Sequence, residues 1–170
     1  MDALECIMTR RSIREYADGC ISENEIEKIL SAGSAAPSAA NQQPWHFVVI
    51  DDREQLKSIA DENPHGRMLK NAAFAIAVAW NSDEKKPYPS LITDDLSAAA
   101  ENILLAAHAL GFGAVWLAIY HDEVKQESIR RILNLPENVF VHSIISFGIP
   151  NEKRSPRTYL KPEMIHRNGW

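Results

Sequence analysis

The stretch Ala36–Ile50 reads APSAANQQPWHFVVI and contains the start of the predicted sheet. Its first part belongs to the segment Ser34–Pro44, which combines small side chains, amides and prolines without apolar periodicity and therefore predicts a loop. Small side chains would let a flat ligand approach this backbone closely; the alternative is a plain connection punctuated by prolines. The second part, Trp45–Ile50, is rich in aromatic and β-branched residues and predicts a strand.

Helices are predicted on both sides of this stretch. Ser22 and Glu25 form a capping-box pattern that starts an amphipathic helix, which we expect to end at Gly33 as a C-cap. Asp2–Arg10 has apolar residues at helical spacing. The longest helix is expected over Thr93–Leu110 and is apolar over more than half its circumference, which is typical of a helix at a domain centre or at a subunit interface.

The other predicted elements alternate irregularly along the chain. Two further helices and three further strands are expected over these ranges: Glu54–Ala60 and His121–Leu133 (helices), Ala73–Trp80, Gly113–Ile119 and Phe140–Phe147 (strands). This order fits a single α+β or α/β domain. Residues 151–170 have no clear period, but their apolar side chains favour docking on the core or on a second subunit: Leu160, Met164, Ile165 and Trp170.

Composition excludes several classes of protein. The chain has 170 residues, 18 Lys and Arg against 23 Asp and Glu, a formal net charge of −5 and 45% hydrophobic residues. These values indicate a folded domain with a core, exclude disorder as the main state and disfavour a general nucleic-acid binder, whose phosphates an acidic protein repels. The longest apolar runs, Ala72–Trp80 and Ala114–Tyr120, are far shorter than the roughly 20 residues that span a bilayer.

The N-terminus and the cysteines indicate the compartment. Met1–Arg14 lacks the apolar run and the cleavage site of a signal peptide. Cys6 and Cys20 cannot form a disulfide framework, and their spacing matches no metal motif. We therefore expect a cytoplasmic protein with reduced thiols, without a membrane, nucleic-acid or metal partner.

The basic residues are unevenly distributed. Eight of the 18 lie in two short segments near the ends of the chain: Arg10, Arg11, Arg14, Lys153, Arg154, Arg157, Lys161 and Arg167. The run Arg10-Arg11-Ser12-Ile13-Arg14, just past a predicted helix, could bind a phosphate dianion through bidentate hydrogen bonds. The alternatives are two solvated charged segments and, for the first segment, a favourable cation at a helix C-terminus.

Other familiar motifs are missing from the sequence. It contains neither a Walker loop nor a G-x-G-x-x-G fingerprint, its six histidines are scattered, and Ser38 lacks the context of a nucleophile elbow. The sequence thus disfavours a phosphate-loop nucleotide enzyme, a metalloenzyme and a serine hydrolase.

Taken in order, four blocks resemble the FMN-dependent nitroreductase family in its short single-domain form: Thr9–Tyr16, Ala36–Val49, Gly111–Tyr120 and Phe147–Trp170, the last with the sequence FGIPNEKRSPR. The resemblance extends over essentially the whole chain. It implies an α+β fold with a central, mainly antiparallel sheet flanked by helices, in an intertwined homodimer with FMN at the subunit interface. Residues 1–150 would form the flavin-binding core, and residues 151–170 a C-terminal extension that docks on the core or on the partner subunit.

The resemblance also implies three groups of cofactor-binding residues. Residues near the two ends match the positions that hold the phosphate, the ribityl chain and the pyrimidine edge of FMN: Arg10, Arg11, Ser12, Arg14, Arg154 and Arg157. Residues of the small loop match a segment that comes from the second subunit and lines the flavin: Pro37, Ser38, Ala39 and Asn41. Backbone groups after a strand would approach the isoalloxazine, here in a segment that often contains glycine in relatives: Leu117, Ala118 and Ile119. No catalytic acid, base or nucleophile is implied.

The implied activity is that of an NAD(P)H-dependent FMN oxidoreductase. Hydride would pass from NADH or NADPH to flavin N5 and then, in a ping-pong sequence, to an electron-poor acceptor such as a nitroaromatic or a quinone. One alternative is a flavin-dependent dehalogenase or flavin-fragmenting relative, for which only Asn63–Lys70 and Asn81–Ser90 could act as lids. The other is a flavin-binding module without turnover.

Overall fold

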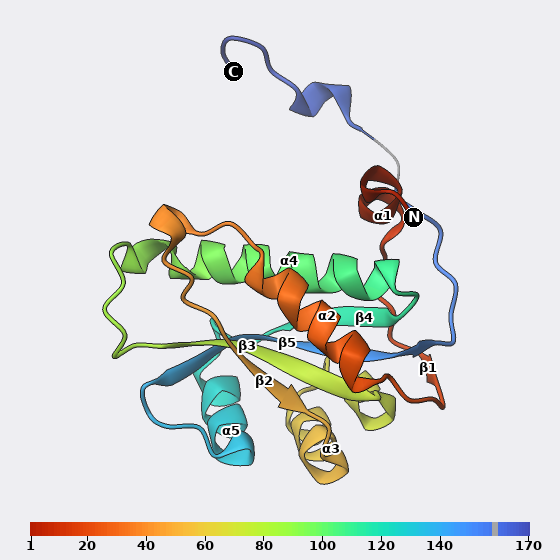
Figure 1. The fold of residues 1–170 in the computed structure, drawn as a ribbon, viewed down its shortest axis with the longest axis vertical. Coiled ribbons are helices and arrows are strands. Elements are labelled where there is room, and N and C mark those ends of the chain that lie inside the picture. Colours follow the sequence, from red (N-terminus) through yellow and green to blue (C-terminus); the bar gives the residue numbers. More distant parts are fainter. Residues whose placement is uncertain (158–159) are drawn as a thin grey trace.

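A five-stranded sheet lies at the centre of the chain in the computed structural model, which describes residues 1–157 and 160–170 (Figure 1). Its strands are β1 (Tyr16–Ala17), β2 (His46–Ile50), β3 (Phe74–Asn81), β4 (Gly113–Ala118) and β5 (Val139–Pro150). The long strand β5 pairs with β1, β3 and β4, and β2 pairs with the free side of β3. All four of these pairings are antiparallel, which confirms the predicted α+β class with a mainly antiparallel sheet.

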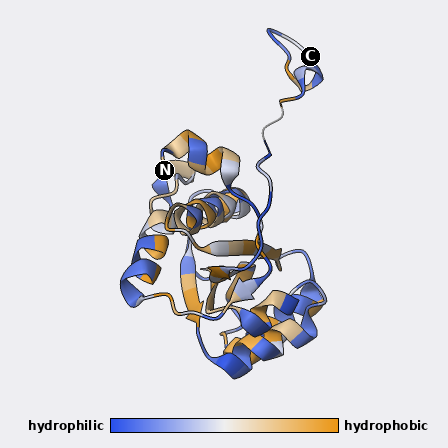
Figure 2. Ribbon diagram, turned by 90° about the vertical axis from the view of Figure 1, so that its right-hand side faces the viewer, coloured by the Kyte–Doolittle hydropathy of each residue, from blue (hydrophilic) through white to orange (hydrophobic). Residues whose placement is uncertain are grey.

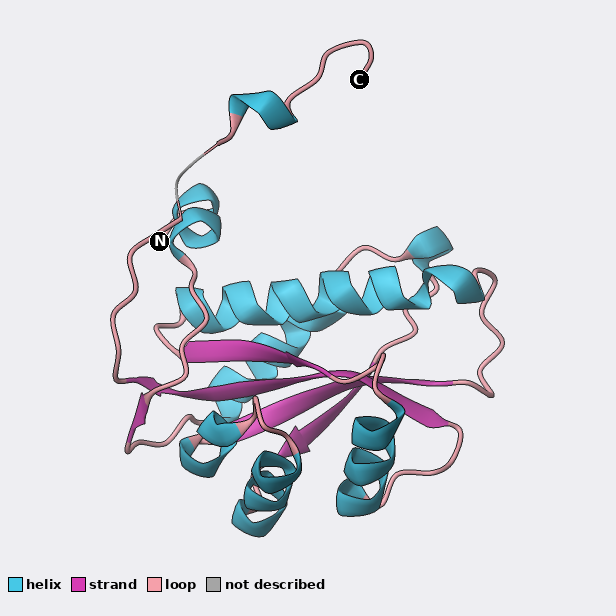
Figure 3. Ribbon diagram, turned by 180° about the vertical axis from the view of Figure 1, so that it is seen from behind, coloured by secondary structure: helices cyan, strands magenta, loops and turns pink. Residues whose placement is uncertain are grey.

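Helices cover both faces of the sheet (Figures 1 and 3). α2 (Glu23–Ser34) and α4 (Ile92–Ala109) lie on one face, and α3 (Arg53–Glu62) and α5 (Glu123–Leu133) lie on the other. α1 (Ala3–Thr9) lies against α4. Short 3-10 helices lie in the connections, η1 (Ala39–Asn41), η2 (Arg67–Asn71) and η3 (Pro89–Leu91), and one lies after β5, η4 (Pro162–Met164).

The strand β3 shows why the sheet is buried on both faces. Its sequence FAIAVAWN alternates large apolar residues with alanines, and Phe74–Trp80 are all buried. Phe74, Ile76 and Val78 pack with residues of α2 and α4, whereas the alanines between them pack with residues of α3 and α5. Successive side chains of a strand point to opposite faces, so this alternation builds two separate core layers.

The prediction that Gly33 caps the second helix is wrong. α2 continues to Ser34, and the Ala35 N–H donates to the Ser31 carbonyl at 3.0 Å. A Cβ atom on Gly33 would lie 2.8 Å from Cγ1 of Ile103 in α4. The glycine therefore allows α2 to pack closely against α4, and it does not form a left-handed turn.

Two other predicted segments, one strand and one loop, differ from the elements in the structure. The strand predicted over Phe140–Phe147 continues to Pro150, and the two-residue strand β1, which was not predicted, pairs with this continuation. A two-residue strand is too short to show periodicity. The predicted loop Ser34–Pro44 contains the single turn η1.

The described part of the C-terminal extension leads away from the core past α1 (Figure 1). The extension predicted over residues 151–170 includes residues 158 and 159, which lie outside the described residues. Its apolar side chains are exposed, and hydrophobic segments are visible along it and along α1 in Figure 2: Leu160, Met164, Ile165 and Trp170 in the extension, Leu4 and Ile7 in α1. Within the described ranges, the structure contains no helix of the length and apolar character needed to cross a bilayer.

Candidate functional site

The two arginine-containing segments near the ends of the chain lie side by side. β1 pairs with the end of β5, with Tyr16 opposite Pro150, and the Asn151 N–H donates to the Glu15 carbonyl at 2.8 Å. This pairing brings the residues before β1 next to the residues after β5. Together they form a cationic cavity of about 190 Å³ with these lining residues: Arg10, Arg11, Ser12, Arg14, Arg154 and Arg157.

The lining of the cationic cavity consists of the six terminal residues that the resemblance assigned to the phosphate, ribityl and pyrimidine positions. Five guanidinium groups around one small cavity create a positive potential that favours a bound anion. A phosphate suits such a site because guanidinium groups form paired hydrogen bonds with its oxygens. The alternative of two separate solvated charged segments does not hold.

Several of these arginines are held by contacts within the chain. Arg10 Nε lies 3.1 Å from Glu101 Oε1 of α4, and the Arg11 guanidinium donates to the Ser155 carbonyl. Within the described residues, the Arg14 side chain forms no ion pair, so its guanidinium is available to a ligand.

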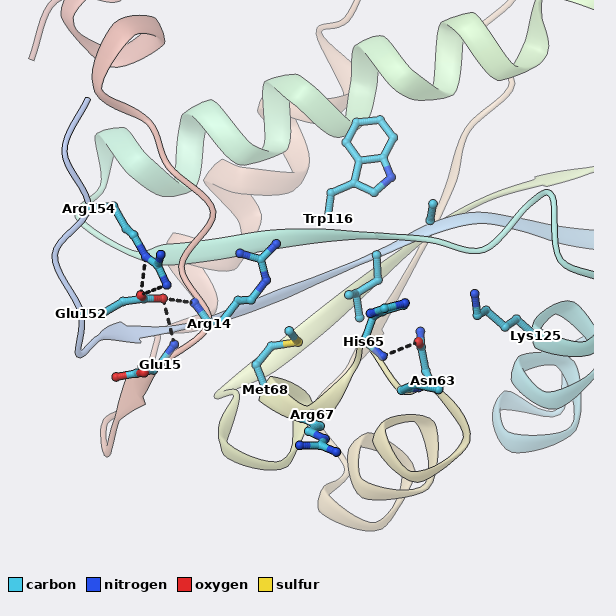
Figure 4. Close-up of a pocket in the computed structure, with 13 residues that line it drawn as sticks. Arg14, Glu15, Asn63, His65, Arg67, Met68, Trp116, Lys125, Glu152 and Arg154 are labelled. Atoms are coloured by element: carbon cyan, nitrogen blue, oxygen red, sulfur yellow. Dashed lines mark hydrogen bonds and ion pairs between the residues drawn. The ribbon is translucent and has the colours of Figure 1, made fainter. Parts of the chain in front are cut away.

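Glu152 joins the two segments and was not singled out from the sequence. Its carboxylate accepts hydrogen bonds from Arg14 N at 2.6 Å, from Glu15 N at 3.3 Å and from Arg154 Nε at 2.5 Å (Figure 4). Its side chain is only 10% exposed, and the Arg14 backbone N–H is the main cause that lowers the pKa of this carboxyl. A carboxylate within the basic stretch FGIPNEKRSPR was the available signal for this role.

A larger cavity of about 700 Å³ adjoins the cationic cavity and shares Arg14 and Arg154 with it (Figure 4). It extends across β4 to the connection after α3 and to Lys125 of α5. Its volume is in the range of pockets that bind small molecules. Met68 and Leu117 are apolar lining residues on the α3 side of the sheet, whereas the ring of the lining residue Trp116 points from β4 toward α4 (Figure 4).

The predicted segment after the start of β4 is divided between this larger cavity and the core. Leu117 and Ala118 line the cavity. The Ile119 side chain is 1% exposed and packs in the core, and its backbone N–H donates to the His142 carbonyl at 3.1 Å. The structure therefore brings two of these three residues to the cavity and leaves Ile119 behind it.

The segment from the end of α3 to the start of η2 supplies lining residues that were not among the predicted site residues, although the segment was considered as a possible lid. Asn63, His65 and Arg67 line the larger cavity. The buried Asn63 side chain accepts a hydrogen bond from His65 N at 3.1 Å, and its carbonyl accepts one from Gly66 N at 2.8 Å. The sequence Asn-Pro-His-Gly is a turn signal, but a local turn does not show which surface it faces.

The predicted loop residues lie elsewhere. Pro37, Ser38, Ala39 and Asn41 line neither cavity. Their loop lies at the N-terminal end of α4, where Ala39 N bonds to Asp95, whereas α1, which directly precedes Arg10 of the cationic cavity, lies toward the other end of α4 (Figure 1). An 18-residue helix such as α4 is about 27 Å long. Within one chain, these four residues are thus not part of the arginine site.

A buried histidine lies behind the larger cavity. The His142 ring lies edge-on to Trp116 with ring centroids 5.4 Å apart, and its Nε2 lies 3.2 Å from Ser97 Oγ. Burial, with a smaller contribution from the charge of His121, lowers the pKa of His142 to about 4. Near neutral pH this histidine is therefore uncharged.

This pKa predicts an acid-dependent loss of stability. The folded-state pKa of about 4 lies below the usual value of 6.5, so the unfolded chain takes up the proton first as the pH falls. The contribution of His142 to the free energy of unfolding should decrease progressively from about pH 6.5 to about pH 4. We expect the free energy of unfolding, measured by urea denaturation, to fall less between pH 7 and pH 5 for His142→Gln than for the unmodified protein. His166→Gln, at an exposed position in the C-terminal extension, is the control that should keep the original loss; equal losses in all three proteins would contradict the prediction.

The chain resembles known proteins along nearly its whole length. The family model described as Nitroreductase family matches residues 7–66 and 59–149. A protein of Archaeoglobus fulgidus with the name "Putative NADH dehydrogenase/NAD(P)H nitroreductase" is 46% identical over 99% of each chain. An FMN-dependent nitroreductase from Clostridium difficile has a TM-score of 0.89 and 31% identity, over 98% of this chain and 99% of its own.

A protein from Desulfovibrio desulfuricans, solved in complex with FMN, has a TM-score of 0.82 and 31% identity, over 98% of this chain and 96% of its own. These solved structures confirm the expected nitroreductase-like fold. The match of the family model, together with the high identity to a relative along nearly the whole chain, shows that the chain belongs to the nitroreductase family.

Proposed function

We propose that this protein is an FMN-dependent oxidoreductase that uses NADH or NADPH to reduce an electron-poor acceptor such as a nitroaromatic or a quinone. The observation that carries the proposal is the cationic cavity, in which six residues from opposite ends of the chain converge beside a cavity large enough for a flat cofactor. The names of the relatives in the nitroreductase family support the same activity.

The residues present fit FMN. Its phosphate would be held in the cationic cavity by Arg11 and Arg157, with Arg10 and Ser12 beside them. Its ring system would lie in the larger cavity, where Met68 and Leu117 supply apolar surface. We propose that Arg14, at the junction of the two cavities, stabilises negative charge on the bound ring.

Bound FMN supplies the hydride chemistry, and the chain supplies binding, orientation and electrostatics. Glu152 holds the Arg14 backbone next to Arg154 and so keeps two cations at the junction of the cavities. The buried His142 lies edge-on to Trp116 and is uncharged near neutral pH, so it supplies no further cation there. No side chain is assigned as an acid, base or nucleophile.

We also propose that the protein is a homodimer in which each subunit completes the site of the other. The loop containing Pro37–Asn41 and the cationic cavity lie toward opposite ends of α4, so a two-fold arrangement of two chains could bring the loop of one to the cavity of the other. The exposed apolar residues of α1 and of the extension, such as Ile7 and Met164, would then be covered. Residues 1–150 would act as the core, and residues 151–170 would dock on the partner subunit.

The cytoplasm is the compartment that we propose for this activity. Both cysteines are free in the structure, Cys6 buried and Cys20 exposed, as expected of a protein in a reducing compartment.

Three measurements on the purified protein test these proposals. Titration with FMN should give a yellow complex, and that complex should oxidise NADH or NADPH when a quinone or a nitroaromatic is added. Light scattering of the FMN-loaded protein should give the mass of two chains. Absence of FMN binding would overturn the proposed function, FMN binding without turnover would indicate a binding module, and a stable FMN-loaded monomer would contradict the shared site.

A further inference from the structure

The loop after α2 has an unusual backbone that contains no glycine. Ala40, Asn41 and Gln43 have φ angles of 46°, 55° and 43°, in the left-handed region. Asparagine tolerates this region, but alanine and glutamine adopt it only at a cost in free energy. All three side chains are exposed, so burial in a core does not compensate for the strain. Something else must hold the loop in this conformation.

A buried polar network supplies that constraint. Asp95, in the first turn of α4, is 5% exposed, and its Oδ1 accepts a hydrogen bond from Ala39 N at 2.9 Å. Its Oδ2 accepts a hydrogen bond from Gln42 Nε2 at 2.6 Å. The Gln42 side chain is 8% exposed and also bonds to both backbone groups of Tyr88, at 3.0 Å each. Lys86 Nζ donates to the Gln42 carbonyl at 3.1 Å.

The contacts of Asp95 and Gln42 flank the strained positions and connect three segments of the chain. The Asp95 carboxylate accepts hydrogen bonds from two residues that flank the strained positions in the sequence. One is Ala39, directly before Ala40, and the other is Gln42, between Asn41 and Gln43. Ser38 Oγ accepts a further hydrogen bond from Gln43 N at 3.0 Å. Strained backbone persists where the surroundings over-determine it, and it is concentrated at ligand sites. Here the surroundings are the start of α4 and the connection around Tyr88.

We propose that Asp95 is a positioning residue that, through Ala39 and Gln42, holds this loop in the conformation in which it lines the FMN of the partner subunit. This inference rests on the proposed function and homodimer. Because Asp95 is in α4 and the loop is at the end of α4, the network also fixes the loop relative to the helix that leads toward the chain's own cationic cavity.

Asp95→Asn tests the role of the carboxylate, since an amide can accept from only one of the two donors and turns its own NH₂ toward the other. One of the two buried donors, Ala39 N or Gln42 Nε2, then loses its acceptor, and the loop is held less firmly in its conformation. We therefore expect FMN to bind about tenfold more weakly. Amide hydrogen exchange of the FMN-free protein should become faster at Ala39 and Asn41. Asp94→Asn, at an exposed position in the same helix turn, is the matched control and should change neither value.

Rescue by glycine separates positioning of the loop from a general effect on α4. Glycine adopts left-handed backbone without strain, so Ala40→Gly should restore much of the FMN affinity of Asp95→Asn, although it changes the affinity of the unmodified protein little. Unchanged affinity and exchange in Asp95→Asn would overturn the inference, as would a loss of affinity that Ala40→Gly does not restore. If the unmodified protein does not bind FMN, the proposed function fails, whereas hydrogen exchange still reports whether Asp95 holds the loop.

Discussion

Replacing Arg10 and Arg11 together with alanine is expected to weaken FMN binding by a factor of roughly 100 to 1000. Both guanidinium groups line the cationic cavity, where each can form charge-assisted hydrogen bonds with a phosphate. Such bonds contribute about 1.5–3 kcal/mol each. Two bonds in the lower part of that range, about 3–4 kcal/mol together, correspond to this factor, because each 1.4 kcal/mol is about tenfold in affinity. Fluorescence titration of FMN at two salt concentrations measures the effect. The FMN affinity of the variant should also change less with salt concentration than that of the unmodified protein.

This loss should not result from unfolding. Arg10 pairs with Glu101 in a partly exposed ion pair, and pairs of that kind contribute at most about 1 kcal/mol to stability. The variant Lys57→Ala/Arg131→Ala removes two exposed cations of α3 and α5 and is the matched control for net charge. If both double variants bind FMN equally well, the phosphate does not occupy the cationic cavity.

Gly148→Ala is expected to lower the free energy of unfolding by about 3 kcal/mol, at the upper end of the effects of overpacking. A Cβ atom at this position of β5 would lie 2.5 Å from Cγ of Tyr16 and 2.9 Å from its Cβ. The Tyr16 ring cannot move aside easily, because its hydroxyl is hydrogen-bonded to the Ile13 carbonyl at 3.0 Å and to Ser146 Oγ at 2.7 Å. Urea denaturation measures the change.

The same substitution should weaken FMN binding, because Tyr16 is in β1 and β1 aligns the segments that form the cationic cavity. Gly169→Ala is the control, since a Cβ atom there would have no atom within 4 Å among those described. A Gly148→Ala protein as stable as the control would show that the contact between β5 and Tyr16 is loose.

The extent to which the site could be predicted depended on the range of the interactions. The six residues of the cationic cavity were identified because they occur in compact blocks of sequence that resemble a known family. Glu152 was not singled out, and the connection after α3 was considered as a possible lid but not as a cofactor-binding segment. Their roles come from contacts with distant segments: Glu152 bonds to Arg14, 138 residues away along the chain. No local pattern in the sequence describes such a contact.

By itself, the sequence determined the elements whose stability is local. The Glu25 side chain accepts a hydrogen bond from Ser22 N at 2.8 Å, as the capping-box pattern predicts, and the apolar spacing of α4 placed that helix to within a residue or so. These features depend on neighbours within one helical turn or on the period of one element.

Only the tertiary structure decided how distant elements approach one another. Gly33 allows close packing against Ile103, the short strand β1 joins the two ends of the chain, and Asp95 holds a strained loop at the far end of α4 from α1. Each of these depends on packing between segments far apart in sequence. Their geometry is set by the whole core, and the period or composition of one segment therefore does not contain it.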